Sequence, residues 1–191
     1  TQCYAMAVST DNGLTFTRPS LGILEFRGSR ENNLLQAGGI PQIPPAFPDT
    51  NPACPPDQRY KGLTARWQEL YAQVSPDGLR WHNIIDGPVK MTGSFDTINT
   101  AFWDACAGRY RSYTRYFINM NEGTTAENVL GGKPTVVRAI QCSLSDDFIH
   151  WDPPLPLTYN DDESHIQLYT NAIVPCPGAE LITGERRAGG A

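Results

Sequence analysis

Short apolar and β-branched runs alternate along this chain with tight polar turns, and three of these turns share one pattern. The copies are Thr10–Phe16, Ser75–Trp81 and Ser145–Trp151. Each copy follows a strand-like run, and the three runs are Cys3–Val8, Glu69–Val74 and Thr135–Cys142. Asp and Gly suit such turns because they tolerate a positive φ or bond back to the backbone. The pattern therefore predicts a repeated unit of strand, turn and strand, with an aromatic residue opening the second strand.

The spacing of the repeat predicts the fold class. Phe16 and Trp81 are 65 residues apart, and Trp81 and Trp151 are 70 apart. A repeat of this length with this mark is typical of the blades of a β-propeller, in which each blade is a four-stranded antiparallel sheet. We therefore expect an all-β fold, a β-propeller with roughly three blades' worth of chain.

The chain is expected to be a single, incomplete propeller domain over residues 1–191. The expected blade segments are about 1–27, 47–90, 95–158 and 166–183. Residues 95–158 give the clearest blade, with strands near Thr100–Ala105, Tyr110–Ile118, Thr135–Leu144 and from Ile149 onward. Further strands are expected at Tyr60–Ala65, Glu69–Ser75, Leu79–Ile85 and Asn171–Cys176. The polar and proline-rich residues 28–57 are expected to be an irregular connection that covers a sheet or lines a pocket.

An open propeller exposes two strand edges, because closed rings have about four to eight blades. The sequence therefore predicts either a fragment of a longer protein or a homo-oligomer whose copies cover each other's edges. The chain begins with Thr1 rather than Met, so we expect a processed protein or a fragment, located outside the cell or in the periplasm.

Composition and charge limit the classes of binding partner that we expect. Hydrophobic residues make up 40% and charged residues 18% of the 191 positions, as in a globular domain. With a net charge of −5 and no basic stripe, no nucleic-acid partner is expected. No apolar run approaches the roughly 20 residues that span a membrane.

The five cysteines lack CxxC spacing and favour core thiols, Cys106 and Cys142 in particular. The three histidines lack metal-ligand spacing, so no metal and no cofactor are expected.

Three polar segments stand where innermost strands would begin, a position that borders the central pocket of a propeller. They are Phe47–Pro52, Phe95–Asn99 and Leu168–Asn171. Each carries Thr followed by Asn, which makes the three asparagines candidate sugar-binding residues: Asn51, Asn99 and Asn171. Asp49 and Asp96 add carboxylates. Glycoside hydrolysis needs such a pair, about 5–5.5 Å apart for retention and about 6.5–9.5 Å apart for inversion.

At these residues the chain resembles the five-bladed β-propeller glycoside hydrolases, which include invertases, fructanases, arabinanases and xylosidases. It is most similar to bacterial proteins described as glycosyl hydrolase family 32 N-terminal-like, or family 43-like. The resemblance extends to about Gly184 and is carried by Asn12–Pro19, Asp49–Pro52, Arg59–Lys61, Ser75–Trp81, Phe95-Asp96, Ala101–Asp104, Ser145–Trp151 and Leu168–Ala172. The segment Ser9–Phe16 also resembles the Asp-box of sialidase propellers, a structural turn remote from the substrate.

The resemblance implies three acidic residues at the starts of innermost strands. By position, Asp49 stands for the nucleophile or base, and Asp96 for the acid that fixes the substrate and tunes pKa values. Glu163 is the nearest candidate for the general acid. His165 lies beside it in the same polar run and is a candidate substrate-binding residue.

Each candidate has a structural alternative that the sequence leaves open. Asp49 also suits a turn, Asp96 also suits a turn cap, and the run around Glu163 and His165 also suits a surface loop. Three tryptophans at matching positions fit packing between blades: Trp81, Trp103 and Trp151. Trp67 lies off that pattern and is the aromatic residue expected to be exposed for sugar binding.

The favoured function is that of a carbohydrate-active β-propeller that hydrolyses glycosidic bonds with carboxylates at the starts of its innermost strands. One alternative is a non-catalytic propeller that binds a glycan or a protein. The other is a structural subunit that assembles with further copies through open blade edges.

Overall fold

The computed structural model describes residues 3–37, 44–66, 68–119, 136–158 and 168–175. Within these ranges the structure is all-β, with antiparallel sheets, one 3-10 turn at Pro56–Gln58 and no α-helix. The predicted all-β class and the four-stranded antiparallel sheets are therefore confirmed. The sheets do not close on one another within the part of the chain that the structure describes. No helix there has the length and apolar character needed to cross a membrane.

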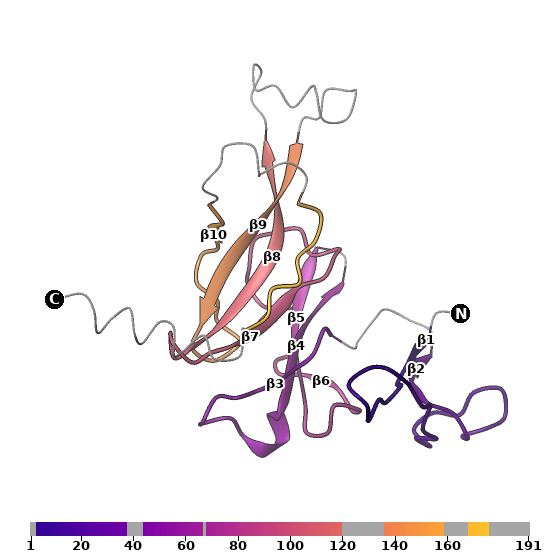
Figure 1. Cartoon of the computed structure of the whole chain (residues 1–191). Helices are drawn as coiled ribbons and strands as arrows, with labels where there is room; N and C mark the ends of the chain where they lie inside the picture. Colours follow the sequence, from indigo (N-terminus) through magenta and orange to yellow (C-terminus); the bar gives the residue numbers. More distant parts are fainter. Residues whose placement is uncertain (1–2, 38–43, 67, 120–135, 159–167, 176–191) are drawn as a thin grey trace.

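Two four-stranded sheets form the body of the molecule (Figure 1). One has the order β3-β4-β5-β6, with β3 Phe47–Pro48, β4 Tyr60–Arg66, β5 Glu69–Ser75 and β6 His82–Asn83. The other has the order β10-β9-β8-β7, with β7 Thr100–Asp104, β8 Arg109–Asn119, β9 Val136–Ser145 and β10 Leu155–Pro156. Each strand pairs with the next one in sequence, so both sheets are simple meanders.

A strand pair stands to one side of these sheets in Figure 1. It consists of β1 (Cys3–Ala5) and β2 (Leu34–Ala37), paired antiparallel. The expectation of an irregular connection over residues 28–57 is therefore wrong for β2. The short apolar run Leu34-Leu35 opens β2, and Leu34 pairs with Ala5 of β1.

The three repeated turns use the same hydrogen bonds. The serine hydroxyl oxygen accepts a backbone N–H at 2.8–2.9 Å from Gly13, Gly78 and Phe148 in the respective turns. One aspartate oxygen accepts the next two backbone N–H groups, in turns built on Asp11, Asp77 and Asp147. The other oxygen bonds a side chain at 2.6 Å, which is that of Thr15, Arg80 or His150. The predicted repeat is thus confirmed at the level of individual hydrogen bonds. The first turn begins at Ser9, one residue before its predicted copy, and has one residue more between Asp11 and the N–H groups that it binds.

In each turn the residue that donates its N–H to the serine has a positive φ, which is 87° at Gly13, 75° at Gly78 and 67° at Phe148. In the first turn Asn12, which directly follows Asp11, also has a positive φ, of 59°. Glycine adopts this conformation without strain, whereas a residue with a side chain does so at a cost. Phe148 is nevertheless fully buried, with its ring 5.8 Å from that of Phe47 and 5.2 Å from that of Tyr110. Aromatic packing between the two sheets offsets the backbone strain at this position.

The core lies between the two four-stranded sheets. Its buried members come from both sheets and the loops beside them: Leu63, Leu70, Ala72, Val89, Phe95, Ala101, Tyr110, Phe148 and Trp151. Trp103 packs against this cluster with its ring 5.0 Å from that of Tyr110. Packing roles for Trp103 and Trp151 are therefore confirmed.

Two sequence expectations fail near this core. Cys106, expected as a core thiol, is exposed in the turn that joins β7 to β8, where its backbone N–H bonds to Asp104 Oδ1 at 3.0 Å. The strand expected at Asn171–Cys176 is absent over residues 171–175. Asn171 bonds to the β7–β8 sheet through its side chain, with Oδ1 accepting from Thr100 Oγ1 at 2.7 Å, and this contact takes the place of a backbone ladder.

Candidate functional site

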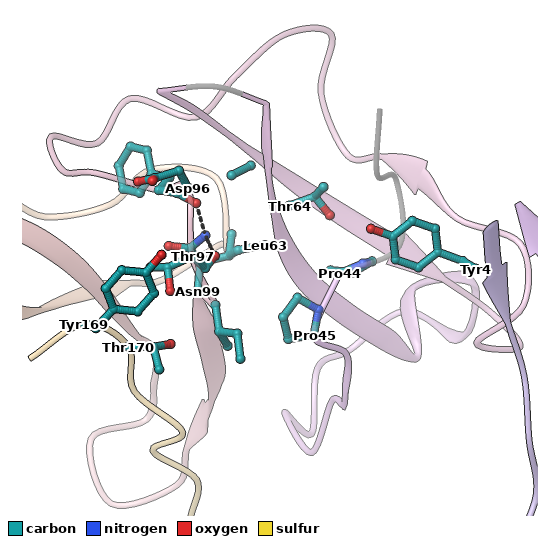
Figure 2. Close-up of a pocket in the computed structure, with 13 residues that line it drawn as sticks. Tyr4, Pro44, Pro45, Leu63, Thr64, Asp96, Thr97, Asn99, Tyr169 and Thr170 are labelled. Atoms are coloured by element: carbon teal, nitrogen blue, oxygen red, sulfur yellow. Dashed lines mark hydrogen bonds between the residues drawn. The ribbon is translucent and has the colours of Figure 1, made fainter. Parts of the chain in front are cut away.

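A cavity of about 730 Å³ lies beside β4, where residues preceding β3 and β7 meet Tyr169 and Thr170. Figure 2 shows Asp96, Asn99, Tyr169 and Thr170 on one side of it and Pro44 with Tyr4 on the other. Two of the three segments predicted to border a central pocket, 95–99 and 168–171, therefore contribute to one cavity. The third, 47–52, does not line it, and Pro44-Pro45 just before β3 take its place.

Gly62 on β4 permits this close approach of the proline segment. A Cβ at position 62 would lie 2.5 Å from Pro44 side-chain carbons and 2.9 Å from the Pro45 carbonyl oxygen. Real Cβ atoms essentially never come so close to other heavy atoms. The absence of a side chain at Gly62 therefore sets where the proline wall of the cavity lies.

Asp96 is the acidic side chain among the described lining residues. Its Oδ1 accepts hydrogen bonds from the Arg115 guanidinium and from Ser94 Oγ, the latter at 3.0 Å. Burial opposes ionisation of Asp96, but these two hydrogen bonds outweigh it and hold the pKa of the carboxyl below its ordinary value. Both hydrogen bonds from the described residues end on Oδ1 and the side chain is 54% exposed, so within this part of the chain Oδ2 is open to a ligand.

Arg115 is the buried support of this carboxylate. Its side chain is 2% exposed, and its Nη2 also donates to Ser94 Oγ at 3.1 Å. The guanidinium carbon lies 5.2 Å from the ring centroid of Tyr169. Arg115 on β8 thus fixes both a carboxylate and an aromatic ring at the cavity.

Asn99 supplies a buried acceptor. Its Nδ2 donates to the carbonyl oxygens of Phe95 and Thr97 at 2.9 and 3.0 Å, which holds the loop before β7 in shape. Its Oδ1 has no hydrogen-bond partner within the described structure, although the residue is only 1% exposed and lines the cavity. Buried polar atoms without partners are rare, so this oxygen suits a ligand that donates a hydrogen bond.

Asn171, predicted to bind substrate, does not line the cavity. Besides the bond from Thr100, its Nδ2 donates to the Tyr113 carbonyl oxygen at 3.3 Å. These two contacts tie the segment 168–175 to β7 and β8, beside which it runs in Figure 1. The structure thus gives Asn171 the position of a residue that holds Tyr169 and Thr170 in place.

Asp49 and Asn51 lie in a separate, buried cluster. The Asp49 side chain is 0% exposed, and its Oδ2 accepts hydrogen bonds from Lys61 Nζ and from the Tyr110 hydroxyl, each at 2.7 Å. Asn51 donates its backbone N–H to Asp49 Oδ1 at 2.9 Å and its Nδ2 to the Tyr110 oxygen at 3.1 Å. These contacts join β4 to β8 across the core. The catalytic role of Asp49 stays a prediction, and a substrate has no access to this carboxylate in the conformation described.

Other candidates lie outside the described residues, namely Glu163, His165 and Trp67. Among the residues that are described, no group of three or more His, Cys, Asp or Glu side chains is placed to hold a metal ion.

Sequence reasoning missed Arg115, Lys61 and Tyr169. The signal for the first two was present, because a charged residue within an apolar strand pattern needs a buried partner of opposite charge. Tyr169 lies in the predicted segment Leu168–Asn171, in which Asn171 is the predicted sugar-binding residue. Which acid each cation pairs with depends on the packing of the sheets.

No protein-family model, curated protein or solved structure matches this chain.

Proposed function

We propose that this protein binds a carbohydrate in the cavity beside β4. The observation that carries the proposal is the convergence of Asp96, Asn99 and Tyr169 on one cavity from segments far apart in the sequence. Asp96 Oδ2 and Asn99 Oδ1, which have no hydrogen-bond partner among the described residues, match the hydroxyl donors of a sugar. An exposed tyrosine ring offers a flat surface for the apolar C–H face of a sugar ring. Concave sites that combine apolar walls with a few placed polar groups are the usual form of small-ligand sites.

The test is isothermal titration calorimetry with sugars of the classes to which the resemblance points: fructose, arabinose, xylose and their tetrasaccharides. At least one series is expected to bind. The variant Asp96→Asn keeps the shape but removes the charge that pairs with the buried Arg115, so its thermal unfolding is measured beside its binding. Tyr169→Ala removes the ring. Each is expected to weaken binding about tenfold or more, since a hydrogen bond to a charged group contributes roughly 1.5–3 kcal/mol.

The matched control is Asp86→Asn, which removes an exposed carboxylate outside the cavity. It is expected to bind like the unsubstituted protein. Absence of binding to every series, or unchanged affinity in both cavity variants, would contradict the proposal.

Hydrolysis of a glycosidic bond is the second candidate function. The observation in its favour is an ionised, half-exposed carboxylate, Asp96, on the cavity. Hydrolysis needs a second carboxyl group, and Glu163 remains the proposed general acid. Release of reducing sugar from the tetrasaccharide that binds, lost in both Asp96→Asn and Glu163→Gln, would support hydrolysis. Binding without release would leave carbohydrate recognition as the function.

The proposed architecture is a β-propeller, supported by two consecutive four-stranded meanders that pack face to face. Closure of the ring would come from further chain or from other copies of this one. Light scattering at micromolar concentration separates these cases, because only the second predicts a discrete oligomer of the 191-residue chain.

A further inference from the structure

The Arg115 guanidinium joins two exposed aromatic rings. Its carbon lies 5.2 Å from the ring centroid of Tyr169 and 5.2 Å from that of Phe117. The arginine itself is 2% exposed, whereas Tyr169 is 56% and Phe117 is 42% exposed. One buried cation therefore contacts two rings at the surface, and we call Tyr169 and Phe117 together the aromatic shelf. The Arg138 guanidinium carbon also lies 5.2 Å from the Tyr169 ring centroid.

The aromatic shelf is continuous with the cavity. Tyr169 lines the cavity, and Arg115 bonds to Asp96, which also lines it. Phe117 lies two residues beyond Arg115 on the same face of β8 and is not part of the lining. A ligand that extends from the cavity past Tyr169 and over Arg115 would reach the Phe117 ring.

The shelf suits a chain of sugars better than a single one. A large aromatic side chain gains free energy when apolar surface covers it, and each sugar unit carries an apolar C–H face. The Arg115 contact holds both rings in place, which lowers the entropy that they lose when a ligand binds. One sugar bound beside Asp96 would leave Phe117 uncovered, whereas a longer chain that runs past Tyr169 would cover it.

From this arrangement we infer that the ligand is an oligosaccharide, with Phe117 as a specificity-determining residue for chain length. This inference rests on the proposed carbohydrate binding. It adds a contact outside the cavity that only the longer ligands make.

The test compares the monosaccharide with the tetrasaccharide of whichever series binds, by calorimetry on the full chain. The tetrasaccharide is expected to bind at least tenfold more tightly. Phe117→Ala is expected to weaken binding of the tetrasaccharide about tenfold, which corresponds to partial burial of one phenylalanine. It is expected to leave the monosaccharide affinity unchanged. Phe117→Tyr keeps a ring and is expected to retain the preference for the longer ligand.

The matched control is Phe16→Ala, which removes a ring that is 64% exposed in the first repeated turn, outside the cavity. It is expected to change neither affinity. Thermal unfolding of each variant checks that Phe117→Ala is folded. If it is not, Phe117→Leu supplies the comparison, because leucine keeps the apolar volume without the flat ring.

Equal affinities for the monosaccharide and the tetrasaccharide would overturn the inference while leaving the proposed function standing. The same holds if Phe117→Ala weakens both ligands alike, because the residue would then act on the cavity itself. If Tyr169→Ala and Asp96→Asn also leave binding unchanged, the proposed function fails and the inference fails with it.

Discussion

At the scale of single residues, the Asp49 carboxylate and the Lys61 ammonium form a buried ion pair between the two main sheets. Their side chains are 0% and 2% exposed, and Tyr110 adds a third partner. A buried charge is tolerated only when it is paired and hydrogen-bonded. The identity of Asp49 is therefore required by packing, independently of any catalytic role.

Asp49→Asn is expected to destabilise the fold by about 3–5 kcal/mol, because it leaves the Lys61 charge buried without its counter-ion. Urea unfolding monitored by tryptophan fluorescence measures the change. The control Asp152→Asn breaks a half-exposed pair with Arg109 and should cost much less, because solvent screens exposed ion pairs. Similar losses in the two variants would show that the Asp49 pair is not isolated from water.

The same pair predicts a dependence of stability on pH. Burial opposes ionisation of Asp49, but hydrogen bonds from Lys61 and the Asn51 backbone outweigh it and hold its pKa below the ordinary 3.8. A carboxyl with a lowered pKa in the folded state stabilises the fold above its ordinary pKa and loses that contribution as pH falls further. We therefore expect stability to drop below about pH 4, and to drop less in Asp49→Asn. Parallel curves for the two proteins would contradict this assignment.

At the scale of elements, the repeated turn is a local device in which a serine and an aspartate bind the backbone within four residues. Burial opposes ionisation of Asp77, but backbone N–H groups of Arg80 and Leu79 outweigh it and lower its pKa to about 2. The turn also needs a positive φ at the residue whose N–H bonds to the serine. A serine and an aspartate two residues apart are present in all three turns, and a glycine indicates the positive φ in two of them, so these turns can be predicted from the sequence.

Gly78→Ala is expected to cost about 1–2 kcal/mol, because alanine is strained at a φ of 75°. Space is not the cause, since the nearest atoms to an added Cβ belong to the Tyr60 ring at 3.8 Å. Gly78→Asn should cost less, because asparagine tolerates this conformation better. Chemical denaturation of both variants measures the difference, and equal losses would argue for a steric rather than a conformational cause.

At the scale of the whole molecule, Phe148 holds the two sheets together. Its ring contacts Phe47 on β3, Tyr110 on β8 and the ring of Trp151. In the other two turns the equivalent residue is glycine. In the third turn the strained backbone of Phe148 allows its side chain to contact both sheets.

Phe148→Ala is expected to destabilise the fold by about 3–5 kcal/mol through loss of the buried ring. Phe148→Gly removes the same ring but relieves the positive φ, so it should be no more destabilising than Phe148→Ala. Both sheets should unfold in one transition, with circular dichroism and tryptophan fluorescence coinciding. Separate transitions would show that the sheets are independent.

The repeated turns, the antiparallel strands around them and the all-β class follow from the order of residues along the chain. Turn bonds such as Ser75 to Gly78 join neighbouring residues, and alternation along a strand is likewise local. The placement of Asp96 and Tyr169 on one cavity, and the burial of Asp49 beneath Lys61 and Tyr110, depend on how the sheets pack. Asp49 and Asp96 stand in similar local sequence, each followed by threonine. Burial and exposure depend on which strands pack together, and packing depends on contacts between residues far apart in the chain.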